Sequence, residues 1–196
     1  MKIKIIQKII DKLRKKKPKS PFSEKLQEKN NIQIQEKNYK NFCVNMEGVN
    51  NTIILEDNSL NEKAKINIQL YGDNNNLIIK KGFILSNHLT FEIGRNLKGY
   101  GKVQNCRIEI GENTSIESCT MTILNSNSYI DIGRECMFAN EINLYNTDSH
   151  PVLDFINKKI INRVKGIKIG NHCWIGRSAT ILKNSIIPDD CIVGWG

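Results

Sequence analysis

The chain has 196 residues, of which 25% are charged and 39% hydrophobic, a composition typical of a soluble protein of one-domain length. It has no run of about eighteen apolar residues, so no membrane-spanning helix is predicted. The net charge of +9 is concentrated in residues 1–19, and because the remainder is nearly neutral, the composition argues against a nucleic-acid-binding protein.

Residues 1–19 contain nine Lys or Arg residues and one acidic residue. Apolar side chains recur there at helical spacing and lysines fill the other face, which predicts a short N-terminal amphipathic α-helix. The apolar positions are Ile3, Ile6, Ile10 and Leu13. One interpretation is attachment of this helix to an anionic membrane surface. The other is packing against the rest of the protein or against a neighbouring subunit, with the lysines in solvent.

Residues 20–41 are polar and weakly patterned, and prolines at positions 18 and 21 end the preceding helix, so we expect a linker here. Residues 42–107 repeat loosely. EGVNNTIIL at residues 47–55 and YGDNNNLII at residues 71–79 are similar segments twenty-four residues apart. Asparagine before an aliphatic run suits a tight corner. We therefore expect irregular early coils of a solenoid, with wide corners.

Residues 108–196 carry a regular repeat of six residues, interrupted by a loop at residues 145–168. Near the C-terminus an aliphatic residue recurs at every sixth position, often followed by glycine, and the fifth place of each hexad is small. The aliphatic positions are Ile169, Ile175, Ile181, Ile187 and Val193. This pattern predicts three short strands per coil of about 18 residues, stacked as a triangular prism.

The loop at residues 145–168 has no hexad pattern of its own. Ile132 and Ile169 are thirty-seven residues apart, an interval that one coil and a looped-out insertion of about eighteen residues would explain. Unstructured loops of this length in a compact protein are usually functional.

Six cysteines occur without a C-x-x-C pair. Cys136, Cys173 and Cys191 fall on the small inward position of the hexad, which favours a packing role. Free thiols and the lack of a secretory apolar segment predict a reducing, cytoplasmic location.

Three segments resemble the hexapeptide-repeat acyltransferases, and within them most closely the galactoside, maltose and sialic acid or polysaccharide O-acetyltransferases. The segments are IGNHCWIGRSATI, IPDDCIVGWG and TDSHPV. The resemblance implies an all-β, left-handed parallel β-helix with an extruded loop. It also implies acetyl-CoA as acyl donor, no metal, and a homotrimer whose active sites form between subunits. Family members continue beyond the position of Gly196, so we expect a C-terminal cap to be missing, and part of the coenzyme A site with it.

His150, which is followed by proline, matches the general base of the enzymes that this sequence resembles. The imidazole would take the proton from an acceptor hydroxyl, which then attacks the thioester carbonyl of acetyl-CoA directly. Imidazole suits this task because its pKa lies near the working pH. Asp148 is the nearest candidate to orient the ring, although its carboxylate could equally cap the turn.

The coenzyme A site implied by the resemblance lies along one corner of the prism. Arg177 and Trp195 are eighteen residues apart at the same place of their hexads, so they should stack in adjacent coils. The expected binding residues are Trp174, Gly176, Arg177, Lys183, Gly194 and Trp195, with Arg177 and Lys183 meeting the phosphates. The alternatives are a subunit contact for the tryptophan, solvent-exposed basic residues, and glycines that only shape the corner.

The favoured function is O-acetylation of a sugar hydroxyl of a bacterial surface polysaccharide, such as a capsule, lipopolysaccharide or sialic acid polymer. The protein would be cytoplasmic or peripheral at the inner face of the plasma membrane, with residues 1–19 as the membrane contact. A nucleotide-sugar N-acetyltransferase is the alternative enzyme, and Asp154 would then bind the acceptor ammonium. A non-catalytic β-helix scaffold is the third. A γ-class carbonic anhydrase is disfavoured, because no two histidines are spaced five residues apart to hold zinc.

Overall fold

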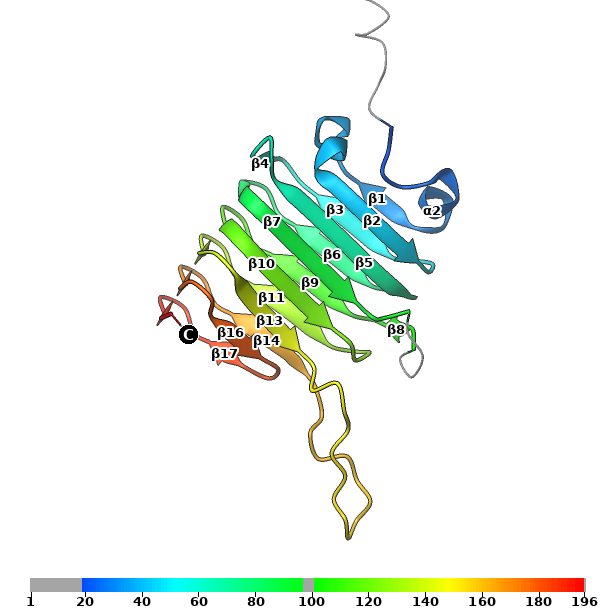
Figure 1. The fold of residues 1–196 in the computed structure, drawn as a ribbon, viewed down its shortest axis with the longest axis vertical. Helices are drawn as coiled ribbons and strands as arrows, with labels where there is room; N and C mark the ends of the chain where they lie inside the picture. Colours follow the sequence, from blue (N-terminus) through cyan, green and yellow to red (C-terminus); the bar gives the residue numbers. More distant parts are fainter. Residues whose placement is uncertain (1–18, 97–100, 196) are drawn as a thin grey trace, which may run out of the picture.

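The computed structural model of the chain describes residues 19–96 and 101–195. These residues form a solenoid of parallel strands, whose coils stack from the N-terminal end in blue to the C-terminal end in red (Figure 1). The amphipathic helix expected at the N-terminus falls on residues 1–18, outside the described residues.

One face of the solenoid, the first face, is a seven-stranded parallel sheet that receives one strand from each coil. Its strands, in spatial order, are β1 (Asn31–Gln33), β3 (Thr52–Leu55), β6 (Asn76–Ile79), β9 (Arg107–Ile110), β11 (Tyr129–Ile132), β14 (Gly166–Ile169) and β17 (Ile186–Ile187).

The other two faces belong to one eleven-stranded sheet that bends along its length. The start of β10 (Ser115–Ile123) pairs with β12 (Met137–Phe138), whereas its end pairs with β13 (Ile142–Asn146). The second face therefore holds β4 (Asn58–Leu60), β12, β15 (Trp174–Ile175), β18 (Ile192–Val193) and the starts of β7 (Phe83–Ile93) and β10. The third face holds β2 (Phe42–Glu47), β5 (Lys65–Asp73), β13, β16 (Thr180–Leu182) and the ends of β7 and β10. A short strand, β8 (Val103–Gln104), pairs with the end of β5.

The early coils are longer than the late ones because their third-face strands are long. On this face β5 has nine residues, whereas β16 has three. The expected wide corners are instead tight: Asn50 and Asn74 adopt φ of 57° each, the left-handed conformation that asparagine tolerates. The two similar segments, residues 47–55 and 71–79, lie side by side in adjacent coils, since Ile53 is the register partner of Leu77.

A buried ladder of asparagines joins the early coils at the corner between the third and first faces. Asn51 accepts hydrogen bonds at Oδ1 from the N–H (2.9 Å) and Nδ2 (3.0 Å) of Asn75, and it makes the same pair of bonds to Oδ1 of Asn30. Asn75 continues the ladder to the N–H of Cys106. The side chains thus satisfy buried backbone donors that an apolar residue would leave unpaired.

The expected linker at residues 20–41 is instead the first coil of the solenoid. It contains α2 (Glu24–Lys29), β1, and the 3-10 helix η1 (Glu36–Asn41), and β1 pairs in register with β3. Ser23 caps α2 by accepting a hydrogen bond from the N–H of Leu26, and Phe22 is buried against Phe42. Sequence periodicity missed this coil because β1 has only three residues and presents a single apolar side chain.

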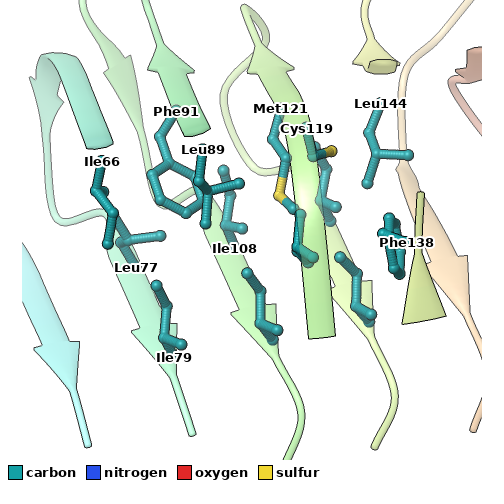
Figure 2. Packing of buried hydrophobic residues seen from close by; sticks show 14 of the residues in the cluster. Ile66, Leu77, Ile79, Leu89, Phe91, Ile108, Cys119, Met121, Phe138 and Leu144 are labelled. Carbon is teal, nitrogen blue, oxygen red and sulfur yellow. The ribbon is translucent and has the colours of Figure 1, made fainter. Parts of the chain in front are cut away.

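The core fills the interior of the prism with one layer of side chains per coil (Figure 2). Its largest fully buried members are Phe83, Phe91 and Phe138. In the regular coils the hexad positions Ile169 and Ile175 are buried as expected. The small position also faces inward, since Cys136 and Cys173 are buried, and burial raises the pKa of the Cys136 thiol to about 11.

The insertion predicted from the thirty-seven-residue interval is present. Ile132 and Ile169 are register partners in adjacent coils, so the interval contains a single coil. Residues 147–165 leave the prism between β13 and β14 and form the long projection in Figure 1. An antiparallel bridge joins Leu153 to Ile160, which makes the projection a hairpin, hereafter the hairpin loop.

The helices found in the described part of the chain, α2 and η1, have six residues each, and no helix there has the length and apolarity needed to cross a bilayer.

Candidate active site

A groove of about 680 Å³ opens where the hairpin loop leaves the prism, at the corner between the third and first faces. Residues 124–126 of the preceding coil form one wall. Residues 147–151 of the outgoing limb and 162–164 of the returning limb form the other. The groove therefore lies between a rigid corner and the root of the loop, and it contains His150.

His150 is exposed in this groove. Its backbone carbonyl accepts a hydrogen bond from Nδ2 of Asn162, at 2.8 Å. Within the described residues, the structure gives the imidazole ring no hydrogen-bond partner. A fixed backbone with an unengaged ring is suited to accept a proton from a bound hydroxyl.

Asp148, two residues earlier, was expected to orient the His150 ring, but its carboxylate contacts Lys183 and Asn162 instead. Its Oδ2 atom lies 2.9 Å from Nζ of Lys183 and accepts a hydrogen bond from Nδ2 of Asn162 at 2.7 Å. The hydrogen bond from Lys183, and then that from Asn162, lowers the pKa of Asp148 below its ordinary value. No hydrogen bond joins Asp148 to the ring of His150 within the described residues.

Lys183 was expected to bind a phosphate of coenzyme A, but its ammonium is engaged elsewhere. It follows β16, at the corner from which the hairpin loop departs, and its side chain is only 17% exposed. Besides the ion pair with Asp148, its ammonium donates to the backbone carbonyl of Asn162 at 3.2 Å. Lys183 thus belongs to the loop root, because its corner is the one that carries the loop.

The other five residues expected at the coenzyme A site lie elsewhere on the prism. Trp174 is in β15 on the second face, and the remaining four follow β15 or β18, at the corner between the second and third faces. These four are Gly176, Arg177, Gly194 and Trp195. The register of β15 with β18 places Arg177 level with Trp195, as expected from their spacing. The structure therefore divides the expected site residues between two different corners.

The environment of this second corner is open. Trp174 is 48% exposed and Trp195 is 80% exposed, while Arg177 forms a loose ion pair with Glu141 at 3.6 Å. A Cβ on Gly176 would lie 2.8 Å from the carbonyl oxygen of Val193, so glycine is needed there for close stacking of the coils.

The sequence reasoning missed two residues at the loop root, Asn162 and Arg163. Both line the groove with His150, but they lie in the stretch without a repeat pattern, where nothing marks one polar residue above another. Among the described residues, no cluster of three or more His, Cys, Asp or Glu side chains is arranged to hold a metal ion.

Comparison with known proteins places the chain in a family. No model of a protein family matches it. The chain is 33% identical over 147 residues to the polysialic acid O-acetyltransferase of Neisseria meningitidis, and the alignment covers 70% of this chain and 68% of that protein. It belongs to the hexapeptide-repeat sialic acid O-acetyltransferase family. As a member of this family, the chain is an acyltransferase.

Further relatives agree with this sialic acid O-acetyltransferase assignment. The polysialic acid O-acetyltransferase of Escherichia coli O1:K1 / APEC is 34% identical over 77 residues, an alignment that spans 39% of this chain and a quarter (25%) of that protein. The crystal structure of the polysialic acid O-acetyltransferase OatWY superposes with a TM-score of 0.59 at 27% identity, covering 84% of this chain and 72% of that one.

The crystal structure of the polySia-specific acetyltransferase NeuO gives a TM-score of 0.54 at 23% identity, over 80% of this chain and 83% of that one, a likeness in fold. The left-handed parallel β-helix expected for a sialic acid O-acetyltransferase of this type is thereby confirmed.

Proposed function

We propose that this acyltransferase moves an acetyl group from acetyl-CoA to a hydroxyl of a sialylated polysaccharide, with His150 as general base. The observation that supports the proposal most is the exposed imidazole of His150, without a hydrogen-bond partner among the described residues, in a groove of about 680 Å³. The similarity to enzymes named as polysialic acid O-acetyltransferases suggests the acceptor.

In the proposed reaction, the acceptor O–H donates to a ring nitrogen of His150. As that proton passes to the imidazole, the oxygen attacks the carbonyl carbon of the thioester and a tetrahedral intermediate forms. The carbon–sulfur bond then breaks, and the imidazolium returns its proton to the departing thiolate of coenzyme A. The base ends the cycle neutral, so the reaction needs no metal or redox partner.

Coenzyme A is proposed to bind along the corner between the second and third faces. Arg177 would contact a phosphate there by a charge-assisted hydrogen bond, and Gly176 and Gly194 would let the backbone approach the pantetheine arm. The tryptophans Trp174 and Trp195 present exposed ring surface at the same place. Lys183 has no part in this site, because its ammonium is engaged at the loop root.

The division of site residues between two corners favours a homotrimer in which one chain supplies His150 and its neighbour supplies the coenzyme A corner. Exposed apolar side chains occur where such a contact would need them. Met137, Trp174 and Ile192 are register partners across the second face, and Phe155 at the tip of the hairpin loop is 85% exposed. Light scattering should give the mass of three chains. A monomer that still consumes acetyl-CoA would contradict the shared site.

The charge of the groove favours an anionic acceptor. Each residue of polysialic acid carries a carboxylate, and Arg163 lines the groove without an ion pair among the described residues. Lys183 lies next to the groove, but its charge is balanced by Asp148. Arg163 is therefore proposed to bind the acceptor carboxylate.

Replacing Arg163 with methionine should raise KM for a sialylated acceptor by about tenfold or more, since a hydrogen bond to a charged group contributes about 1.5–3 kcal/mol. Steady-state kinetics with oligomers of sialic acid measures this. Lys165→Met is the matched control, because Lys165 is exposed and meets Asn184 through its backbone N–H. An unchanged acceptor KM in the Arg163 variant would exclude the assigned contact.

The function itself is tested by release of the coenzyme A thiol with polysialic acid, with a neutral polysaccharide and with an amino sugar nucleotide. Release that depends on polysialic acid is expected. Release that depends only on the amino sugar would favour the N-acetyltransferase alternative. In that alternative Asp154 would bind the ammonium, but its carboxylate already accepts hydrogen bonds from the N–H groups of Ile156 and Asn157 in the hairpin turn.

A cytoplasmic location and a membrane contact through residues 1–19 stay predictions from the sequence. Sedimentation with anionic vesicles, comparing the full chain with one that lacks residues 1–19, tests the membrane contact. Equal sedimentation of the two would exclude it.

A further inference from the structure

The root of the hairpin loop is held by one asparagine that contacts three backbone or side-chain groups of the opposite limb. Nδ2 of Asn162 donates to Oδ2 of Asp148 at 2.7 Å and to the carbonyl of His150 at 2.8 Å. Its Oδ1 accepts from the N–H of Val152 at 2.7 Å. The side-chain amide of Asn162 thus bonds to His150 and to the residues two positions before and after it.

A dipeptide of the next coil fastens this root to the prism. Lys183 reaches both limbs, through Asp148 Oδ2 at 2.9 Å and the carbonyl of Asn162 at 3.2 Å. Asn184 donates from Nδ2 to the carbonyl of Arg163 at 2.9 Å and accepts at Oδ1 from the N–H of Lys165 at 2.7 Å. The Lys183 side chain is 17% exposed and that of Asp148 is 38% exposed, so the lysine is the more buried partner of this ion pair.

Beyond the root, hydrogen bonds join the two limbs of the hairpin loop to each other. The N–H of Ile161 donates to the carbonyl of Val152 at 2.9 Å, and that of Asp154 donates to the carbonyl of Lys159 at 2.8 Å. The contacts at the root therefore set the position of His150 relative to the groove wall at residues 124–126.

We propose that Lys183 and Asn162 are positioning residues that act through Asp148 and the backbone of His150 to hold the base in the groove. This inference rests on the proposed function for its catalytic consequence. It assigns Lys183 a role different from phosphate binding, and it assigns Asp148 to the loop root instead of to the imidazole. The lowered pKa of Asp148 agrees with a carboxylate that stays charged in this contact.

Kinetics separates the two roles of Lys183. In Lys183→Met, kcat should fall by about 10- to 100-fold through misplacement of the base, with KM for acetyl-CoA unchanged. Lys183→Arg should recover most of the lost turnover, because the guanidinium carries the same charge and can donate to both oxygens. A phosphate-binding lysine would instead raise KM for acetyl-CoA and leave kcat unchanged, which would overturn the proposal, as would no change in either constant.

A double-mutant cycle tests the route through Asp148. Asp148→Asn combined with Lys183→Met should lose no more kcat than the worse single variant, since both changes break one contact. Additive losses would mean that Asp148 acts on the ring independently. Lys165→Met is the control for removing a lysine near the loop. The melting temperature of Lys183→Met should fall by no more than about 4 °C, the shift expected from the loss of one ion pair.

Hydrogen exchange gives a readout that does not require turnover. The N–H of Ile161 should exchange at least about tenfold faster in Lys183→Met and in Asn162→Ala, because the opening of the loop root becomes easier. The N–H of Val152 reports the same opening in Lys183→Met, which leaves its acceptor Asn162 in place. Unchanged exchange would overturn the positioning role. If the unaltered protein transfers no acetyl group, the proposed function fails, and the exchange rates still decide whether these residues hold the loop.

Discussion

Replacing His150 with alanine is expected to lower kcat by at least about a hundredfold, the usual contribution of a positioned general base. The imidazole is the titratable ring exposed in the groove, and its loss leaves the acceptor hydroxyl without a proton acceptor there. The KM for acetyl-CoA should stay unchanged, because the expected coenzyme A residues lie at another corner of the prism. Steady-state thiol release measures both constants.

His88→Ala is the matched control for this prediction. His88 is exposed on β7 at the bend between the second and third faces, three coils before Gly176, and it is outside the groove that contains His150. Its kcat should equal that of the unaltered protein. Loss of less than about tenfold in the His150 variant would exclude its role as general base, since such a small effect lies below the range for general base catalysis.

Replacing Phe91 with alanine is expected to lower the free energy of unfolding by about 3–5 kcal/mol. Phe91 is 0% exposed, and its neighbours in the register of the third face are Ile68 on one side and Met121 on the other. Because side chains of the coils on both sides pack near the ring, its removal leaves a cavity in the core (Figure 2). Urea denaturation followed by circular dichroism measures the change.

Thr90→Ala gives the comparison on the same strand. Thr90 alternates with Phe91 on the outward side of the strand, where it is half-buried and its hydroxyl accepts a hydrogen bond from Nδ2 of Asn67 at 3.4 Å, so its replacement should cost no more than about 1 kcal/mol. A loss below about 1 kcal/mol for Phe91→Ala would contradict the packed interior of the prism, because a fully buried phenylalanine contributes more than that to a core.

The regular part of the fold was predictable because its signal is strictly periodic. Ile169, Ile175 and Ile181 each fall six residues apart and all face the core. The six-residue period also showed where the repeat is interrupted, because the interval from Ile132 to Ile169 is too long for one coil. That interval located the hairpin loop. The early coils lack the hexad because their third-face strands are long. The first coil at residues 20–41 was not predicted because β1 has only three residues and a single apolar side chain.

Some residues of the candidate site could be predicted from the sequence, but their arrangement could not. His150 could be identified from the segment TDSHPV, and the spacing of Arg177 and Trp195 correctly predicted that they share a corner. Spacing along a solenoid does not tell which side-chain partner a residue finds across a loop. Lys183 therefore looked like a phosphate ligand, whereas its corner position brings it to Asp148. Asn162 had no signal, because its role depends on the closure of the hairpin loop.

The most direct test of the central claim is to incubate the protein with polysialic acid and acetyl-CoA labelled with carbon-13 in the acetyl group, and to examine the polymer by NMR. We expect label on the polymer as an ester, which mild alkali removes, and no label with the His150→Ala variant. Label that resists mild alkali would indicate transfer to nitrogen. That result, or an unlabelled polymer, would contradict O-acetylation of a sialylated polysaccharide by this chain.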